Sequence, residues 1–555
     1  MAEWRRKLKG LFLGTDPGAN GRPQFDLLPG QEADPNINPQ DNEPGMFNTE
    51  EGAGITVVGL RANIGNGNNA TNQLFEDFPS RIDGIQINGA NHGGAIFVNG
   101  WAANLQISNN RLTGNHGSFG GGIRIGDPRL VLAGNNDGYN MDVVIRNNEV
   151  LQNGGIDGAG GGIALYTGST NYQVTENRVC GNYSSGNGGG IGHLGESHNG
   201  LIANNQVLFN QSFNQGQSAN GGGVYVGGNV LIATALTDGS GSVLVDRNLI
   251  QGNNAGAGDG GGVRLERIDG AGIQGPACTG GNGPRSCNAG GPTANWTLNK
   301  IKITNNMIVN NVAGMAGGGI SIQDAISVDI INNTVANNDS TATAGEAFTP
   351  GNPNISVAQP AGIVSRSHSV ALTNSLSGNP SVDPYRNYSN PTMANNIIWQ
   401  NRSFHFEISL TDPSMFGLVP NIFGGDAPVY DDLGVVGYAA GTLTSTNSVM
   451  TGDADPAFIA EYVNGTRDQT IAIPEVKTSI ATAVAFDEGG NFIDVHYGPL
   501  TLDGDNDGVR NSNYHIDGTS SAIDGADGAA APANDFDGQA RPLGGADDIG
   551  ADEAQ

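Results

Sequence analysis

Three carboxylates near the end of the chain have the spacing of a calcium-binding loop. Asp503, Asp505 and Asp507 follow the pattern D-x-D-x-D-G. Calcium prefers carboxylate and carbonyl oxygens, and this spacing turns alternate side chains of a tight loop toward one ion. Asn511 stands at the ninth position, where a ligand is accepted, but Tyr514 replaces the glutamate expected at the twelfth. We therefore predict a shorter structural Ca²⁺ loop completed by ligands from elsewhere. An ordinary turn rich in aspartate and glycine is the alternative.

A second group of titratable side chains surrounds His193. Glu196 and His198 follow it closely, which makes this the densest cluster of titratable groups in the chain. Imidazole and carboxylate groups at this spacing could bind a metal ion or exchange a proton during catalysis. A hydrogen-bonded structural histidine is the alternative. The choice depends on the elements that carry these residues.

Those elements follow from a repeat of the form V-x-I-x-N-N-x-I-x-x-N. The first constant asparagine occurs in eight segments, as Asn110, Asn148, Asn177, Asn205, Asn248, Asn306, Asn333 and Asn396. A second asparagine follows five residues later, as Asn115, Asn153, Asn182, Asn210, Asn253, Asn311, Asn338 and Asn401. A third element, G-G-G-I-x-I or a close variant, lies between successive segments. The apolar residues alternate within each element, which predicts three short strands per repeat.

The repeat predicts an all-β protein, a single-stranded right-handed parallel β-helix with three strands per coil. Equivalent asparagines are as little as 27 residues apart, at 306 and 333, about the length that three strands and three turns need. A β-propeller blade needs roughly 40–50 residues and four strands, and no six-residue period supports a left-handed helix. Inward isoleucine and valine would form an apolar column, because no coil buries its apolar face alone. Asparagine suits the corners because it tolerates left-handed backbone and can bond to the next coil.

Alternation within G-G-G-I-x-I predicts a column of outward side chains on successive coils. Aromatic rings there could stack on sugars, and arginines could bind carboxylates. The predicted ligand-binding face comprises Phe97, Arg124, Tyr166, Tyr225 and Arg264. The candidates for catalysis are Arg124, His193, Arg264 and Glu266. An ordinary solvated sheet face is the alternative. His193 occupies an inward slot, so either that coil slips in register or a histidine faces the core.

The spacing also predicts the organisation of the chain. Residues 1–54 form an N-terminal extension or capping segment, 55–405 the β-helix, 406–500 an irregular C-terminal lobe and 501–555 a terminal segment. Insertions near 127–141, 228–241 and 267–299 all follow a G-G-G-I strand, so they should stand along one edge of the β-helix. Such an edge is often the binding face of a solenoid. The alternative is a corner that merely tolerates additional length.

The composition of the chain limits the classes of partner and the cellular compartment that can be predicted for it. The net charge of −29 disfavours nucleic acid and favours cations. No apolar run reaches the length of a membrane span, and the basic start lacks the long apolar core of a signal peptide. Cys278 and Cys287 lie close together in a Gly/Pro-rich stretch, and we predict a disulfide between them in an oxidising compartment. Cys180 falls on the repeat, where a buried cysteine acts as a small hydrophobe.

The repeats resemble the pectate-lyase-like right-handed β-helix superfamily. The ending, from Asn513 through Asp535-Phe-Asp537-Gly-Gln-Ala-Arg541-Pro to Asp548-Ile-Gly-Ala-Asp-Glu553, is similar to the terminal segment of bacterial extracellular β-helix proteins. The resemblance covers about 55–405 and 513–555, and implies an extracellular or cell-surface location. Hydrolases of this fold use N-T-D, D-D and G-H-G motifs, whereas here the Asp431-Asp432 and Asp547-Asp548 pairs lie outside the repeat and no N-T-D or G-H-G occurs.

Three functions remain open at this point. The first is a secreted or surface-exposed protein with a structural, adhesive or glycan-binding role, whose partners would be polysaccharides, surface glycans or other surface proteins. The second is a Ca²⁺-assisted lyase of acidic polysaccharide, which would use an arginine or lysine base. The third is a passive domain of a larger surface protein. The repeat is specific for fold and unspecific for function, so the sequence leaves catalysis undecided.

Overall fold

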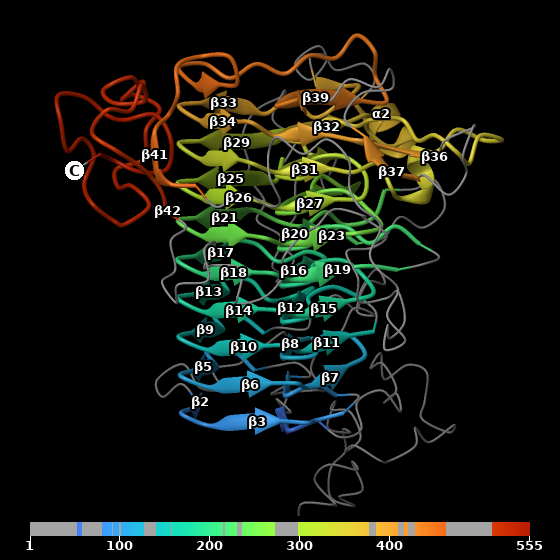
Figure 1. The fold of residues 1–555 in the computed structure, drawn as a ribbon. Coiled ribbons are helices and arrows are strands. Elements are labelled where there is room, and N and C mark those ends of the chain that lie inside the picture. The colour runs from blue at the N-terminus through green and yellow to red at the C-terminus, as the bar shows by residue number, and fades with distance from the viewer. Residues whose placement is uncertain are drawn as a thin grey trace, which may run out of the picture.

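The computed structural model is a tall stack of short strands (Figure 1). It describes residues 53–57, 80–91, 93–98, 102–126, 140–156, 158–214, 217–229, 236–271, 298–376, 385–408, 416–419, 428–461 and 513–554.

Four long sheets make up the stack, and we name them A to D. Sheet A contains β1 (Ile55–Val57), β4 (Ile96–Val98), β8 (Ile123–Ile125), β12 (Ile163–Tyr166), β16 (Ile191–Leu194), β20 (Val224–Gly227), β24 (Val263–Glu266), β28 (Ile320–Gln323), β32 (Ile363–Arg366) and β39 (Leu433–Val436). Sheet B contains β2 (Arg81–Asp83), β5 (Gln106–Ser108), β9 (Val144–Arg146), β13 (Gln173–Thr175), β17 (Gly200–Ala203), β21 (Val243–Asp246), β25 (Lys300–Thr304), β29 (Ser327–Ile331) and β33 (Thr392–Ala394). Sheet C contains β3 (Gln86–Asn88), β6 (Arg111–Thr113), β10 (Glu149–Leu151), β14 (Arg178–Cys180), β18 (Gln206–Leu208), β22 (Leu249–Gln251), β26 (Met307–Val309), β30 (Thr334–Ala336), β34 (Ile397–Trp399) and β40 (Val449–Met450). Sheet D contains β7 (His116–Gly117), β11 (Gly154–Gly155), β15 (Tyr183–Ser184), β19 (Gln211–Ser212), β23 (Asn254–Ala255), β27 (Val312–Ala313), β31 (Asp339–Ser340), β35 (Arg402–Ser403) and β38 (Val429–Tyr430).

The chain passes through sheets B, C, D and A in turn and then adds the next strand to sheet B. We call one such passage a coil. Neighbouring strands are parallel, except that β38 pairs antiparallel with β35. The predicted parallel, nearly all-β architecture is therefore confirmed. The prediction of three strands per coil missed sheet D, whose two-residue strands follow the second asparagine and are too short to show an alternating apolar pattern.

The core is the column of inward side chains that the repeat predicts. In sheet A, Ile123, Ile163 and Ile191 lie directly above one another and are fully buried. Equivalent isoleucines and valines of sheets B and C join the same apolar cluster. Cys180 is buried outside this column, against Leu208. Because each coil shields the apolar residues of its neighbours, the stack stabilises what no single coil could.

Two ladders of buried asparagines run along the corners between sheets B and C and between sheets C and D. In the second ladder, Asn253 Oδ1 accepts hydrogen bonds from the backbone nitrogen and Nδ2 of Asn210, at 2.9 and 3.0 Å. Asn253 Nδ2 donates to Asn311 Oδ1 and to the carbonyl of Val207, both at 2.9 Å. The ladders thus satisfy the backbone groups that the corners leave unpaired.

The left-handed backbone at these corners belongs to the residue before each ladder asparagine. Arg247 (φ 54°) precedes Asn248, and Gly252 (φ 66°) precedes Asn253. The predicted reason for asparagine was thus half wrong. Its amide is needed for the bond to the next coil, whereas the backbone strain falls on a neighbour that is often glycine or another asparagine.

The second ladder ends on a carboxylate. Asp432 Oδ1 accepts from Asn401 Nδ2 at 2.8 Å, and Asp432 Oδ2 accepts from the backbone nitrogen of Thr451 at 3.0 Å. Burial raises the pKa of Asp432, and burial together with Asp432 raises the pKa of Asp431 to about 6. This pair, outside the repeat in sequence, therefore has a structural role in closing the ladder.

The stack extends beyond residue 405. Strands β39, β40 and β38 come from the segment 429–450, within the stretch expected to be irregular, and add to sheets A, C and D. The hairpin of β36 (His405–Ile408) and β37 (Phe416–Val419) stands apart from these sheets.

Long connections gather at the corner between sheets A and B. The stretches 127–141, 228–241 and 267–299 all fall there, and much of each lies outside the described residues. The helix α2 (Val370–Ser375) lies in another connection at the same corner. The 3₁₀ helix η3 (Gly345–Ala347) instead lies between sheets D and A.

The C-terminal segment 513–554 packs on the side of the stack, against the outer face of sheet C (Figure 1). Its strand β42 (Asn513–Ile516) pairs antiparallel with β41 (Phe458–Ala460). Tyr514 contributes to an apolar cluster with Met307, Ile397 and Ile549. The segment therefore braces the last coils laterally.

Candidate functional site

The predicted ligand-binding column on sheet A forms in register but is buried. Phe97 lies beside Arg124, and Tyr225 lies beside Arg264, on neighbouring strands. All four side chains, and that of Tyr166, are at most 2% exposed. The expected open face for sugars is therefore not present on these residues.

A backbone connection covers this column. The residues between sheets D and A fold back over the outer side of sheet A, where Ala159 packs against Tyr166 and Tyr225. The Tyr166 hydroxyl donates to the carbonyl of Phe119 at 2.7 Å. A Cβ at Gly192 would meet the backbone nitrogen of Gly160 at 2.3 Å, so glycine is required at Gly192 for this close approach.

The two arginines proposed for catalysis are held by their neighbours. Arg264 donates to Ser321 Oγ at 2.7 Å and to Gln323 Oε1 at 2.6 Å. Its guanidinium also lies 3.5 Å from Asp259 and 3.6 Å from Glu266. The charge of Arg264 is thus balanced by Glu266 on its own strand and by Asp259 in the connection that precedes this strand.

Tyr225 extends this network. Its hydroxyl donates to Glu266 Oε2 and accepts from Arg267, both at 2.9 Å. Burial raises its pKa above the ordinary value. Arg124 stacks over the ring of Phe97, with its guanidinium carbon 4.2 Å from the ring centre. These contacts are those of a packed polar layer.

His193 faces the core with no slip in register. It lies between Leu165 and Val226 on the neighbouring strands and is fully buried. Its Nε2 lies 2.8 and 2.9 Å from the carbonyl oxygens of Gly195 and Ser240, so Nε2 carries the proton. Its Nδ1 therefore accepts from the Tyr172 hydroxyl at 2.8 Å. Burial lowers the pKa of His193 to about 4, and the ring is a neutral structural group at pH 7.

This burial makes stability depend on pH. The folded-state pKa lies below the unfolded value of about 6.5, so the unfolded chain binds more protons between these values. Stability is consequently lost as the pH falls from about 6.5 to about 4, by about 3 kcal/mol. We expect the double variant His193→Leu/Tyr172→Phe to lack this loss. The measurement is the urea midpoint of both proteins from pH 8 to pH 4.5.

Comparing the wild type with the double variant removes the contribution of the other titratable groups. Asp269, whose pKa burial raises to about 6, acts with the opposite sign in both proteins and cancels in the difference. The variant leaves the carbonyls of Gly195 and Ser240 without a side-chain donor, so it should be less stable at pH 8. The difference in stability between the wild type and the variant should narrow as the pH falls. Parallel curves would contradict a neutral buried His193.

Of the other predicted metal sites, the structure describes the one around His193 but not the Ca²⁺ loop. Glu196 and His198 form a pair, with Oε1 and Nε2 3.3 Å apart, while both ring nitrogens of His193 are engaged elsewhere. The predicted Ca²⁺ ligands Asp503, Asp505, Asp507 and Asn511 lie outside the described residues, as do Cys278 and Cys287. Within the described part of the chain, one group of three or more histidine and carboxylate residues is close enough to share a metal ion: His515, Asp537 and Asp552.

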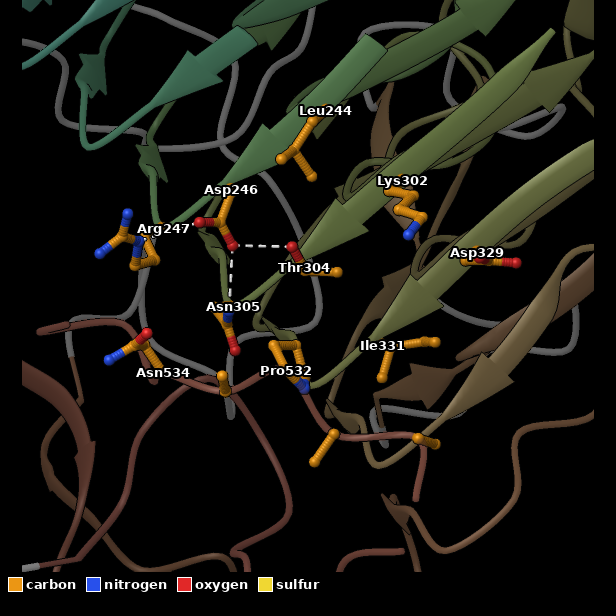
Figure 2. Close-up of a pocket in the computed structure, with 13 residues that line it drawn as sticks. Leu244, Asp246, Arg247, Lys302, Thr304, Asn305, Asp329, Ile331, Pro532 and Asn534 are labelled. Atoms are coloured by element: carbon orange, nitrogen blue, oxygen red, sulfur yellow. Dashed lines mark hydrogen bonds and ion pairs between the residues drawn. The ribbon is translucent and has the colours of Figure 1, made fainter. Parts of the chain in front are cut away.

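A cavity of about 410 Å³ opens elsewhere, between the outer face of sheet B and the C-terminal segment (Figure 2). Strands β21, β25 and β29 form one wall, and residues 530–534 form the other. We call it the sheet B groove. Its lining residues are Leu244, Asp246, Arg247, Lys302, Thr304, Asn305, Asp329, Ile331, Ala530, Ala531, Pro532, Ala533 and Asn534.

One carboxylate of the groove is satisfied by its neighbours. Asp246 Oδ1 accepts from Thr304 Oγ1 at 2.7 Å and Asn305 Nδ2 at 2.9 Å, while Oδ2 accepts from Arg247 Nε at 2.9 Å (Figure 2). Asp329 pairs with Lys300, which stands beside the groove, at 2.5 Å. These polar groups are therefore fixed in position before any ligand arrives.

Lys302 is the free cation of the groove. It is exposed and lies between Leu244 and Asp329 on the neighbouring strands. Its ammonium makes no hydrogen bond or ion pair with the described residues. The sequence analysis did not identify Lys302 as a candidate, and no pattern indicated that residues 530–534 would close a groove over it.

Comparison with family models, curated proteins and solved structures found no match to this chain. No helix in the described part of the chain is long and apolar enough to cross a membrane.

Proposed function

We propose that this protein is a single-stranded right-handed parallel β-helix of the pectate-lyase-like type. The recurring order B, C, D, A from β5 to β32 and the parallel pairing of these strands in each sheet support this proposal. A right-handed turn is the usual hand of parallel crossovers. On this view the stack is a stiff scaffold, because its core and both asparagine ladders are continuous.

The function that we propose is glycan binding at a cell surface or in the extracellular medium. The observation that carries it is the sheet B groove, which combines a free cation with fixed polar groups and apolar patches. Its volume of about 410 Å³ lies in the range of small-ligand sites, about 300–1,000 Å³. A segment of polysaccharide fits this description better than a flat protein partner does.

The groove matches the chemistry of a sugar chain bearing an acidic substituent. Sugar hydroxyls can donate hydrogen bonds to the carboxylate of Asp329 and can bond to the Asn534 amide. The C–H faces of a sugar ring can pack on Leu244, Ile331 and Pro532. Lys302 would bind a carboxylate or sulfate as a point charge. The net charge of −29 repels a polyanion at long range, so binding should need moderate salt or a sparsely charged glycan.

We expect Lys302→Ala to weaken retention on the best acidic glycan by about tenfold, since one exposed charged hydrogen bond contributes about 1.5 kcal/mol. The screen uses the purified chain against neutral and acidic polysaccharides. It measures retention, new reducing ends and unsaturated product, with and without Ca²⁺. Retention without product is the expected result.

Arg81→Ala is the matched control. Arg81 stands in the same outward column of sheet B but on β2, far from the groove. Its loss should leave retention unchanged. Equal retention of wild type and Lys302→Ala would exclude the groove as the site. Product formation would instead support a lyase, and no retention on any glycan would favour a passive domain of a larger surface protein.

A further inference from the structure

Three potential metal ligands meet in the C-terminal segment. His515 lies on β42, and its Nε2 is 3.2 Å from Asp537 Oδ2 and 3.9 Å from Asp552 Oδ1. The three ligand atoms lie within 4.8 Å of one another. They come from three separate stretches of the segment, so only its folded form brings them together.

The tautomer of His515 is set by Asn513. Asn513 Oδ1 accepts the backbone N–H of His515 at 3.0 Å, which fixes the oxygen on the side of the ring. The same oxygen contacts His515 Nδ1, so Nδ1 must be the donor. In the neutral ring the lone pair is therefore on Nε2, and it points at the two carboxylates. Metal-binding histidines characteristically donate their second ring N–H in this way.

Asp552 adds a carboxylate whose side chain is largely buried. Its side chain is 6% exposed, and Oδ2 accepts from the backbone nitrogen of Ile516 at 3.1 Å. Within the described residues, Oδ1 receives no hydrogen bond, and its nearest ion-pair partner is His515 Nε2 at 3.9 Å. One carboxylate oxygen of Asp552, the carboxylate of Asp537 and the imidazole lone pair of His515 thus converge with no hydrogen-bond donor among them.

We propose that His515, Asp537 and Asp552 form a binding site for a divalent transition-metal ion such as Zn²⁺. The ion would lie between the Nε2 lone pair of His515 and the carboxylate oxygens of Asp537 and Asp552.

The ligand chemistry and spacing select the class of ion. One imidazole nitrogen with two carboxylate oxygens suits Zn²⁺ and neighbouring transition metals, whereas Ca²⁺ prefers oxygen ligands alone. Tetrahedral bonds of about 2.0–2.2 Å require ligand atoms roughly 3.3–3.6 Å apart. The observed 3.2 and 3.9 Å from His515 Nε2 bracket this value, and all three ligand atoms lie within 4.8 Å of one another, so the side chains would have to move closer together around the ion. Asp537 is 40% exposed, which leaves the ion open to water as a further ligand.

A bound ion would cross-link three stretches of the C-terminal segment. It ties β42, which packs on sheet C through Tyr514, to the turn at Asp537 and to the last residues at Asp552. This role is independent of the glycan groove and of the predicted Ca²⁺ loop at 503–511.

The experiment titrates Zn²⁺ into the full chain after chelator treatment, by calorimetry, and repeats it with Co²⁺ followed by visible absorption. The wild type should bind one ion more than His515→Gln, and chelator should lower its Tm. Asp552→Asn and Asp537→Asn should also lose that ion. The wild-type visible bands of nitrogen-ligated Co²⁺ should disappear in His515→Gln.

Two controls isolate the site. His198→Gln removes a different carboxylate-paired histidine, and Asp505→Asn disrupts the predicted Ca²⁺ loop. Both variants should keep the wild-type number of Zn²⁺ ions. Circular dichroism checks folding, and Asp537→Asn, at the most exposed ligand, serves if His515→Gln does not fold. The proposal fails if the wild type binds no Zn²⁺, or if a folded ligand variant retains the full number of ions and the same Co²⁺ spectrum.

Discussion

Replacing Asn253 by leucine is expected to destabilise the surrounding coils by about 4 kcal/mol. The change removes four hydrogen bonds: two that Asn253 Oδ1 accepts from Asn210, and two that Asn253 Nδ2 donates to Val207 and Asn311. Each contributes about 1 kcal/mol, and the buried backbone N–H of Asn210 loses its acceptor. The measurement is the unfolding midpoint in urea, together with hydrogen exchange in β18, β22 and β26.

The adjacent residue is the matched control. Asn254 is also asparagine and is 1% exposed, but neither polar atom of its side chain has a partner within the described residues. Its neighbour on the next coil is Val312. The same substitution, Asn254→Leu, should therefore be neutral or stabilising, because it removes a buried polar group that gains no hydrogen bond. Equal losses from the two variants would disprove the special contribution of the ladder.

Replacing Arg541 by methionine should release the C-terminal segment from sheet C. Arg541 and Glu553 form an ion pair in which both side chains are 1% exposed. Arg541 also donates to the carbonyl oxygens of Gly550 at 3.0 Å and Ala551 at 3.1 Å. Removing one member of such a pair costs about 3–5 kcal/mol, because the other charge stays buried. Amides of 520–554 should then exchange roughly two to three orders of magnitude faster.

The exposed pair of Arg111 and Glu149 tests whether burial is the cause. Their charged groups are 3.5 Å apart, and the side chains are 58% and 47% exposed. Arg111→Met should change stability by less than about 1 kcal/mol, as is usual for surface ion pairs. Wild-type protection of 520–554 in Arg541→Met would show that the segment is held by its apolar contacts alone.

The acidic residues of the C-terminal segment accept hydrogen bonds from its own backbone. Asp535 Oδ1 accepts from the backbone of Gln539 at 2.7 Å, and Glu553 Oε2 accepts from that of Leu543 at 3.0 Å. Asp548 Oδ2 accepts from Ala554 at 2.7 Å. The acidic pattern that suggested a family resemblance therefore serves largely to satisfy backbone donors in a segment with little regular structure.

The amino-acid sequence was sufficient to predict the parallel stack, its inward apolar columns and its asparagine ladders. These features repeat, and a repeat places the same side chain in the same environment on every coil, so local chemistry and spacing carry the information. His193 illustrates this in part: alternation placed it in an inward slot but left a slip in register open, and the structure shows the histidine facing the core. Sheet D was missed because two residues cannot show a period.

Only the tertiary structure decided which outward side chains are accessible to solvent. The column from Phe97 to Arg264 was predicted correctly in register, yet the backbone near Ala159 covers part of it and carboxylates balance Arg264. The sheet B groove and the His515 cluster each join residues that are distant along the chain and follow no repeat. Non-periodic contacts of this kind depend on how the C-terminal segment packs, and packing is settled by the summed burial of many residues rather than by any local pattern.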